Sequence, residues 1–434
     1  MKSSGIFLLT LFMSFQLFAQ NEVRSKIDAL ADKIEPKVIE WRRHFHQYPE
    51  LSNREFKTAE KVAAHLKNLG LQVQTKVAHT GVVGILKGGK SGPVVALRAD
   101  MDGLPVTERV NVAFASKVRS TYNNQDVGVM HACGHDSHVA ILMGVAEVLT
   151  ELKDDLHGTV KFIFQPAEEG APPGEEGGAR MMVKEGVLEN PKTDVIFALH
   201  ISSKTEVGKI TYRPGGLLAA ADRFIIKVKG KQTHGSTPWT GVDPITVSAQ
   251  IISGLNNIIS RQTELTKEAA IISVGLIRGG VRSNIIPEEC EMIGTIRTLN
   301  TDMQKIIHEK IRLTATKIAE SAGAVAEVDI QIGVPVTFND PELTARMLST
   351  VQRVAGGENV VLINAITGAE DFSFYVEKIP GFFFFLGGMP KGMKKEDAAP
   401  HHTPDFYIDD SGLKLGVRAL TNLTVDYMAG QGTN

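Results

Sequence analysis

The sequence predicts an α/β protein in which a small domain is inserted into a larger one. Short apolar runs alternate with amphipathic helical stretches through the first half of the chain. The middle of the chain carries a βαββαβ series, which is self-sufficient as a small ferredoxin-like domain. Helical and buried-strand patterns return after that series. We therefore expect the larger domain to be assembled from both ends of the chain.

The N-terminus is predicted to be a secretory signal peptide, residues 1–19. Lys2 precedes a mostly apolar run from Ile6 to Phe18, and the small residue Ala19 is followed by polar residues. Polar residues interrupt the run, which is shorter than the roughly 20 residues needed to span a bilayer. We therefore expect export and cleavage, with a periplasmic or secreted mature protein, rather than a stable membrane anchor.

Residues 20–215 are expected to form the first part of the larger domain. Several of its strands end at polar residues, and open α/β sheets place their sites at strand ends. The expected elements are helices at 22–51 and 53–69, strands at 81–86 and 94–98, a helix at 138–152, a strand at 160–165, a helix at 179–185 and a strand at 195–200.

Residues 216–333 are expected to form the inserted domain, and residues 334–434 the second part of the larger one. The hinges are expected near 214–217 and 333–335, where Gly and Pro interrupt the patterns. The inserted series has strands at 221–229, 270–277, 289–298 and 326–332 and helices at 243–261 and 301–321, and it is followed by a helix at 339–356, a strand at 381–386 and a helix at 411–427.

Composition and charge exclude several classes of protein. The chain has 47 Lys and Arg against 49 Asp and Glu, so it lacks the basic surplus of a nucleic-acid binder. A charged fraction of 22% fits neither a disordered tail nor a fibrous protein. With two cysteines, an exported chain of this length is not a disulfide scaffold. A globular enzyme or binding protein remains.

The two cysteines have different surroundings. Cys290 lies in an alternating strand pattern and is expected in a core. Cys133 lies in the segment HACGHD (131–136), a dense group of side chains that can bind metal. A single bridge between the two stays open, but a thiol in such a group suggests a ligand.

Residues 84–91 satisfy the pattern of a phosphate-binding loop. That loop requires a helix that starts at its Lys-Ser pair. Here Gly92 and Pro93 follow, and then another strand. We therefore interpret the segment as a glycine-rich hairpin turn.

Side chains able to bind divalent cations recur near the strand ends. Cations that activate water need imidazole, thiolate or carboxylate ligands and an open coordination position. Each group is weak evidence alone, but several groups in one α/β unit predict a metal centre. The groups are Asp100 and Asp102, Cys133 and His135, Glu168 and Glu169, His200, and His401 and His402.

The adjacent Glu168 and Glu169 suggest a division of labour. Neighbouring side chains on an extended segment point in opposite directions. One glutamate can therefore bind metal while the other acts as general base toward a bound water. Glu175 and Glu176, farther along the same loop, are interpreted as a solvated acidic turn.

Longer motifs surround these residues, in the order WRRHFHQYPELS (41–52), RADMDGLP (98–105), HACGHD (131–136), PAEEG (166–170), THGSTP (233–238), GVDP (241–244), NIIP (284–287), GAEDF (368–372) and HTP (402–404). Over nearly the whole mature chain they resemble the amidohydrolase branch of the M20 metallopeptidase family. The resemblance implies a mixed-sheet, zinc-peptidase-like catalytic domain with an inserted lid that is also the dimerisation domain. The family includes hydrolases of hippurate, of indoleacetyl-amino acids and of N-acetyl-diaminopimelate, together with aminoacylase-like and carboxypeptidase-like enzymes.

The resemblance also implies roles for single residues. Glu168 matches the catalytic base, and Asp102 matches a carboxylate that orients a ligand and raises its basicity. His234 matches a histidine that reaches the active site of a partner subunit and stabilises the oxyanion, and Asn284 matches a substrate-binding position. The positions that match the ligands of two divalent ions are Cys133, His135, Glu169, His200 and His402.

The chain departs from the wider family at the metal site. The wider family has a histidine ligand where this chain has Asp100, and a bridging aspartate where this branch brings in Cys133 and His135. A thiolate ligand favours zinc, whereas carboxylate ligands also suit manganese, so the sequence leaves the identity of the metal open between zinc and manganese. His401 could compete for the ligand role, but the Thr-Pro that follows favours His402.

The predicted function is a metal-dependent amidohydrolase that cleaves N-acyl amino acids through a metal-activated water. The expected substrate carries a free carboxylate, which Arg282 is a candidate to bind. The alternative for Arg278 and Arg282 is a pair of solvated loop arginines. A homodimer through the lid is expected, and no nucleic-acid partner.

An M20-type dipeptidase or carboxypeptidase that uses the same site is the first alternative function. A non-catalytic metal or peptide binder is the second. It is disfavoured because the presumed base and all five ligand positions are present.

Overall fold

The computed structural model describes residues 4–430, with side chains from residue 22 onward. The first three residues of the predicted signal peptide lie outside this range. Of residues 4–19 only the backbone is described, as the first part of helix α1 (Ser4–Gln47). Among the described residues, none of the helices combines the length and apolar character that a membrane span requires. The chain forms two compact units, one with the residues up to Pro214, Asn339–Ile363 and the residues from Lys378 on, the other with Gly215–Phe338 and Asn364–Glu377.

The first unit is built on a mixed sheet of eight strands, counted over the described residues. In spatial order they are β1 (Gln72–Val77), β2 (Gly81–Lys87), β6 (His157–Gln165), β3 (Lys90–Asp100), β7 (Val195–Glu206), β18 (Gly381–Met389), β8 (Ile210–Tyr212) and β17 (Val360–Leu362). The central strands β6, β3, β7 and β18 run parallel, so their carboxyl ends meet at one edge. The antiparallel strands β1 and β2 extend the sheet on one side, and β8 with β17 extends it on the other.

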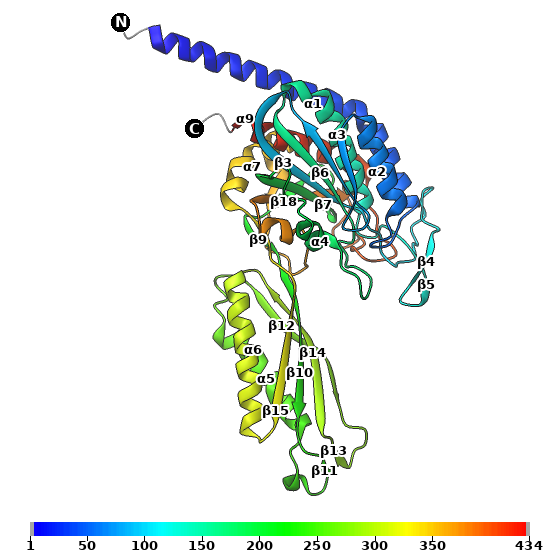
Figure 1. Cartoon of the computed structure of the whole chain (residues 1–434), viewed down its shortest axis with the longest axis vertical. Coiled ribbons are helices and arrows are strands. Elements are labelled where there is room, and N and C mark those ends of the chain that lie inside the picture. The colour runs from blue at the N-terminus through cyan, green and yellow to red at the C-terminus, as the bar shows by residue number, and fades with distance from the viewer. Residues whose placement is uncertain (1–3, 431–434) are drawn as a thin grey trace. The chain divides into compact units, whose positions relative to one another are not determined.

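Helices pack on this sheet (Figure 1), and the faces that meet form one apolar core. Helices α3 (His135–Glu151) and α9 (Leu413–Ala429) contact the central strands, and α1 contacts both of them. Almost every residue of α3 is buried, as expected for a helix enclosed between a sheet and another helix. The remaining helices of this unit are α2 (Phe56–Asn68), which contacts β1 and β2, α4 (Gly178–Lys184), which contacts β6, and α7 (Pro341–Ala355), which contacts α9. The predicted α/β class with a mixed sheet is confirmed.

The second unit has a four-stranded antiparallel sheet with two helices on one face (Figure 1). Alternate residues of its central strand β10 are buried under these helices, as the period of two requires. The order along the chain is βαββαβ. The elements are β10 (Ala220–Lys229), α5 (Pro244–Gln262), β12 (Ala270–Gly279), β14 (Glu289–Thr298), α6 (Thr301–Ser321) and β15 (Val325–Val334), and the spatial strand order is β12, β14, β10, β15.

The second unit is larger than the predicted insertion of residues 216–333. Residues 364–377, which we expected in the larger domain, pack with the start of the insertion. The backbone N–H of Ala219 donates to the carbonyls of Ile366 at 3.1 Å and Gly368 at 2.8 Å. Leu218 forms a parallel bridge with Ile366. These contacts join segments about 150 residues apart, which local sequence patterns do not reveal.

Residues 84–91 form neither a phosphate-binding loop nor a hairpin. Lys90 and Ser91 begin strand β3, where a phosphate-binding loop would begin a helix. The predicted hairpin is wrong because β2 pairs with β6, and β6 pairs with β3. Strand β6 therefore lies between two strands that are consecutive in the chain.

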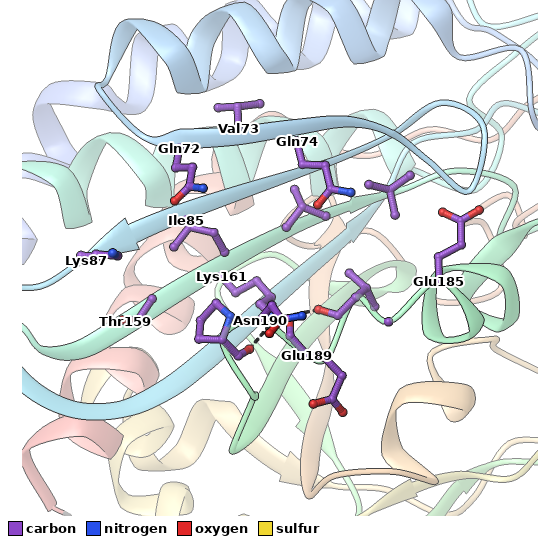
Figure 2. Close-up of a pocket in the computed structure, with 15 residues that line it drawn as sticks. Gln72, Val73, Gln74, Ile85, Lys87, Thr159, Lys161, Glu185, Glu189 and Asn190 are labelled. Carbon is purple, nitrogen blue, oxygen red and sulfur yellow. Dashed lines mark hydrogen bonds between the residues drawn. The ribbon is translucent and has the colours of Figure 1, made fainter.

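Strand β6 also carries a buried lysine, beside a pocket of about 580 Å³ (Figure 2). Lys161 is 1% exposed, and its ammonium donates to the carbonyls of Val187 at 2.7 Å, Glu189 at 2.9 Å and Pro191 at 2.8 Å. An ammonium has three donors. Because the loop carbonyls take all of them, Lys161 holds the loop in place and has no donor left for a ligand in the pocket.

Candidate metal centre

The candidate site lies where the central parallel strands end. Asp100 at the end of β3 is opposite Gln165 at the end of β6. The segments that follow the two strands therefore start side by side. This register brings Asp102 close to Glu168 and Glu169, although about 65 residues separate them in the chain.

His200 lies inside β7, so the prediction that the strand ends there is wrong. Strand β3 pairs with β7 only up to Ala198, whereas β18 still pairs beyond that point, with Phe385 opposite His200. The backbone N–H of Ile201 donates to Nε2 of His138 in α3 at 2.8 Å. Beyond Ala198, β7 therefore pairs with β18 on one side only. On its other side, His138 of α3 accepts a backbone N–H of β7 where β3 no longer pairs.

Cys133 and His135 are positioned by the turn into α3. Gly134 between them has φ of +94°, and a Cβ there would lie 2.3 Å from Cγ2 of Ile201. Only glycine meets both conditions. The thiol of Cys133 lies 3.3 Å from Nε2 of His200.

Two of the candidate ligand histidines have their tautomer set by hydrogen bonds. Nδ1 of His135 lies 3.2 Å from a carboxylate oxygen of Asp102, and Nδ1 of His200 lies 2.7 Å from the carbonyl oxygen of Ile201. Both acceptors require the proton on Nδ1. In the neutral ring Nε2 therefore keeps a lone pair that can bind a cation.

His402 is the third candidate ligand histidine. Its Nε2 lies 3.3 Å from Sγ of Cys133 and 3.0 Å from a carboxylate oxygen of Glu169. Its φ of +64° is in the left-handed region, where a non-glycine residue costs about 1–3 kcal/mol. Its backbone N–H donates to the carbonyl of Ala132 at 2.8 Å. The surrounding structure thus holds His402 in a strained conformation that presents its ring to Cys133.

His401 lies close to the same thiol but is engaged differently. The backbone N–H of Ser203 donates to its Nε2 at 3.2 Å, so the ring proton is on Nδ1, which faces the carbonyl of Cys133 at 3.2 Å. Burial and the charge of a neighbouring histidine lower the pKa of His401 to about 3, so the ring is neutral. His138 is used in the same way, because its Nε2 accepts a backbone N–H and its Nδ1 donates to Asp100. Neither ring has a lone pair to offer a cation.

The different engagement of the two adjacent histidines gives a testable prediction. We expect His402→Ala to weaken divalent-cation affinity by well over about 100-fold, and His401→Ala to weaken it less, by about 10–100-fold at most, the range typical of residues that only support a ligand. Metal content after dialysis, measured by elemental analysis, checks this. Equal losses in the two variants would contradict the assignment.

Glu168 and Glu169 lie in a turn, and the predicted extended segment is wrong. Ala167 has φ of +52°, which turns the chain before them. Both carboxylates approach Nε2 of His135, Glu168 at 3.7 Å and Glu169 at 3.9 Å, so the two side chains do not point in opposite directions. The two glutamates differ in a second contact, since the carboxylate of Glu169 also lies 3.0 Å from Nε2 of His402.

Asp102 lies behind these residues and holds several of them. Besides the ring of His135, it accepts the hydroxyl of Ser52 at 2.7 Å and the backbone N–H groups of Glu168 and Glu169, each at 3.1 Å. These contacts place Asp102 where a ligand-orienting carboxylate is expected.

Glu55, which was not predicted from the sequence, lies beneath the same turn. It is fully buried, and its carboxylate accepts the backbone N–H of Ala167 at 2.9 Å. Its position three residues after the motif at 41–52 was the available signal. Burial and the negative charge of Asp102 raise the pKa of Glu55 to about 8.

The raised pKa of Glu55 predicts a pH-dependent stability. An unfolded glutamate titrates near pH 4.3. Between that pH and about 8 the folded state binds more protons, so this group's contribution to stability is complete at low pH and is lost as the pH rises toward 8. In metal-free protein, we therefore compare the free energy of unfolding of Glu55→Gln with that of the parent. We expect the difference to shift in favour of the variant by on the order of 3 kcal/mol when the pH is raised from about 5 to about 8. Urea unfolding at both pH values measures this, and a pH-independent difference would contradict it.

The donor set fits a divalent cation. Burial and the charges of nearby carboxylates such as Glu169 raise the pKa of the Cys133 thiol well above its usual value. Burial lowers the pKa of His135, but the charges of Asp100 and Asp102 outweigh it and raise that pKa to about 10. Both groups must lose a proton before they bind metal. In the described part of the chain, Nε2 of His135 is buried without a hydrogen-bond partner, and buried Oε1 of Glu169 has its ion-pair contact with Nε2 of His402 at 3.0 Å. A cation would satisfy Nε2 of His135.

The remaining predicted residues belong to the second unit. The short strands β11 (Thr233–His234) and β13 (Ile285–Ile286) pair, and a backbone hydrogen bond of 2.8 Å joins the residue after His234 to Asn284. Arg282 lies in the exposed turn that leads into β13. The structure therefore brings His234 and Asn284 together at one end of this unit.

Comparison with known proteins decides the family. The model described as peptidase family M20/M25/M40 matches residues 96–426. The chain belongs to this family. Thermostable carboxypeptidase 1 of Saccharolobus solfataricus is 41% identical over 91% of this chain and 96% of its own length. N-acetylcysteine deacetylase of Bacillus subtilis is 36% identical over 91% of this chain and 98% of its own. The crystal structure of the Bacillus subtilis YXEP protein, described as a dinuclear metal binding peptidase from the M20 family, has a TM-score of 0.77 and 35% identity over 92% of this chain and 99% of that one.

Membership of M20 confirms the resemblance, the fold class and the enzyme class inferred from the sequence. The chain is an M20 hydrolase that acts on amide bonds. Its cofactor is a dinuclear centre of divalent metal. Both carboxylate oxygens of Asp100 are engaged, one by Arg98 at 2.6 Å and the other by His138 at 2.5 Å.

Proposed function

We propose that this protein hydrolyses the amide bond of N-acyl amino acids, with Glu168 as general base. The placement of Glu168 carries the proposal. Its carboxylate lies 3.7 Å from Nε2 of His135, within reach of the site, whereas the carboxylate of Glu169 also lies 3.0 Å from Nε2 of His402 and groups with Cys133. The two glutamates are thus suited to different tasks. A relative named as a deacetylase of an N-acetyl amino acid supports the substrate class.

The proposed ligand set is the one that presents lone pairs or negative charge to a common space. When bound, two divalent cations would lower the pKa of a water molecule and polarise the amide carbonyl. The five ligands are Cys133, His135, Glu169, His200 and His402.

Glu168 would transfer one proton in two stages. It takes a proton from the attacking water as the oxygen bonds to the amide carbon, and it returns the proton to the nitrogen as the carbon–nitrogen bond breaks. This step gives a carboxylic acid and a free amino group, and a further proton passes from the acid to the amine to give the carboxylate and the ammonium form of the amino acid. Asp102 keeps this geometry by holding the backbone of the turn and the ring of His135.

His234 is proposed to donate a hydrogen bond to the oxyanion, acting in the partner subunit's site. Its Nδ1 accepts the backbone N–H of Ser236 at 3.0 Å, with the Ser236 hydroxyl at 2.8 Å. In the neutral ring the proton is then on Nε2, which makes this atom a donor. Asn284 beside it, and Arg282 near it, are proposed to bind the substrate, with Arg282 contacting its carboxylate.

A homodimer is proposed because the end of the second unit that carries His234 also exposes large apolar side chains. Trp239 is 79% exposed and Val281 is 97% exposed. Apolar side chains gathered on a surface often mark a protein interface. Light scattering of the mature protein tests the dimer.

Export through residues 1–19 is likewise proposed from the sequence, and N-terminal sequencing of the mature protein tests it.

A carboxypeptidase is the second candidate function, because the thermostable carboxypeptidase is 41% identical to this chain. It would use the same site on peptides. Hippurate, N-acetyl amino acids and dipeptides, each assayed with zinc, manganese or cobalt, separate the candidates. We expect the N-acyl amino acids to be hydrolysed fastest. Faster cleavage of dipeptides would favour the peptidase, and metal binding without any hydrolysis would favour a binding protein.

A further inference from the structure

The turn that carries Glu168 is held by two buried acidic side chains, Glu55 and Asp102. The backbone N–H of Ala167 donates to Glu55 at 2.9 Å, and those of Glu168 and Glu169 donate to Asp102 at 3.1 Å each. Three successive amides thus point toward acidic groups beneath the turn. Successive N–H groups in a turn form a concave site that favours negative charge.

Ala167 shows that this turn needs support. Its φ of +52° lies in the left-handed region, which a residue with a Cβ occupies only when the surroundings enforce it. A change at Ala167 would rotate the chain just before Glu168. The carboxyl group of Glu55 accepts the backbone N–H of Ala167. It therefore fixes the backbone at the residue whose conformation determines where the side chain of Glu168 points.

Glu55 is itself held from several sides. Its Oε1 also accepts the backbone N–H of Asn53 at 3.1 Å, and its Oε2 accepts the hydroxyl of Thr80 at 2.5 Å. Although Glu55 is the residue before α2, its side chain does not cap that helix. Glu50 instead accepts the N–H groups of Lys57 and Thr58 in the first turn of α2, at 3.1 and 2.9 Å. The side chain of Glu55 is therefore available to the turn and fixed in place.

We propose that Glu55 is a positioning residue for the reaction, which fixes the backbone of Ala167 so that the carboxylate of Glu168 points at the metal site. The proposal depends on the role of Glu168 as base. Because a misplacement of about 1 Å can cost about 100-fold in rate, a residue that does not touch the substrate can still control turnover.

The chain offers a matched control for a purely structural role. Glu185 accepts the backbone N–H of Ala78 at 2.8 Å, and Ala78 also has a positive φ, of +47°. The two glutamates thus support the same kind of strained alanine. Only the one at Ala167 adjoins the proposed base.

We test the proposal with Glu55→Ala, Glu55→Gln and Glu185→Ala in the metal-loaded enzyme. Glu55→Ala should lower kcat by at least about tenfold, with KM and metal content changed less than about twofold. Glu55→Gln should stay within about threefold of the parent, because its amide oxygen accepts the same N–H groups and its NH₂ donates to Thr80. Glu185→Ala should keep the parent kcat, whatever its effect on thermal stability.

If Glu55→Ala fails to fold, Glu55→Asp replaces it, because aspartate keeps the carboxylate but is one methylene too short to span Ala167 and Thr80. An unchanged kcat in Glu55→Ala or Glu55→Asp would overturn the proposal, as would equal losses in Glu55→Ala and Glu55→Gln. Failure of the proposed function is a separate result, since it would show as turnover by Glu168→Gln or as no hydrolysis by the parent.

Discussion

Glu168→Gln is expected to lower kcat by about 10³-fold and to leave the metal content unchanged. The carboxamide keeps the size of the side chain but cannot take a proton from water, and general-base catalysis contributes about 10²–10⁴-fold. Metal content should be retained because Glu169, and not Glu168, lies against Cys133 and His402. Steady-state kinetics on an N-acetyl amino acid, with elemental analysis of the same preparation, measures both.

Two neighbouring glutamates serve as controls. Glu169→Gln should lose metal together with activity, because its carboxylate is part of the ligand cluster. Glu175→Gln should retain both, since Glu175 is exposed and pairs with Arg54 on the surface of the same loop. Turnover by Glu168→Gln near the parent rate would exclude the residue as base.

The elements of the fold were predictable from sequence to a greater extent than their pairing. The buried central strands, such as β6 and β18, appear as apolar runs, because both of their faces are covered. The strand order is not visible in this way. Strand β6 lies between β2 and β3 because it pairs with residues about 70 positions earlier in the chain. Strand β7 pairs along its length with β18, which begins only at Gly381. A local pattern contains no information on such partners.

The same distinction applies to the candidate site. The residue types and their places near strand ends predicted that the groups able to bind divalent cations form one metal centre, and Asp102 lies against the backbone of Glu168 and Glu169. Which histidines can bind a cation depends on the ring nitrogen that a distant backbone group occupies. Ser203 engages Nε2 of His401 from about 200 residues away. Glu55 was not predicted because it lies three residues beyond the motif at 41–52, and its burial is not visible in the local sequence.

His234→Ala is the second large effect that we expect, a loss of about 10²–10³-fold in kcat. Removal of one donor to a developing oxyanion typically costs this much. Folding should be nearly unaffected, because the ring is exposed and its hydrogen bonds are confined to its own turn with Ser236. Circular dichroism and thermal melting give the stability, and kinetics on the N-acetyl amino acid give the rate. Trp239 is also exposed beside this turn. We expect Trp239→Ala to lower the affinity of the dimer more than it lowers kcat.

A mixture of His234→Ala with Glu168→Gln subunits determines where His234 acts. If it acts in the partner's site, the hybrid dimer contains one complete site, with Glu168 from the first subunit and His234 from the second. Random exchange of subunits would then restore about a quarter of the parent activity, because half of the dimers are hybrids and each has one working site of two. If His234 acts within its own subunit, both sites of the hybrid remain defective and the mixture stays inactive. Subunit exchange must be verified by differential tagging, since an inactive mixture counts against the trans arrangement only when hybrids have formed.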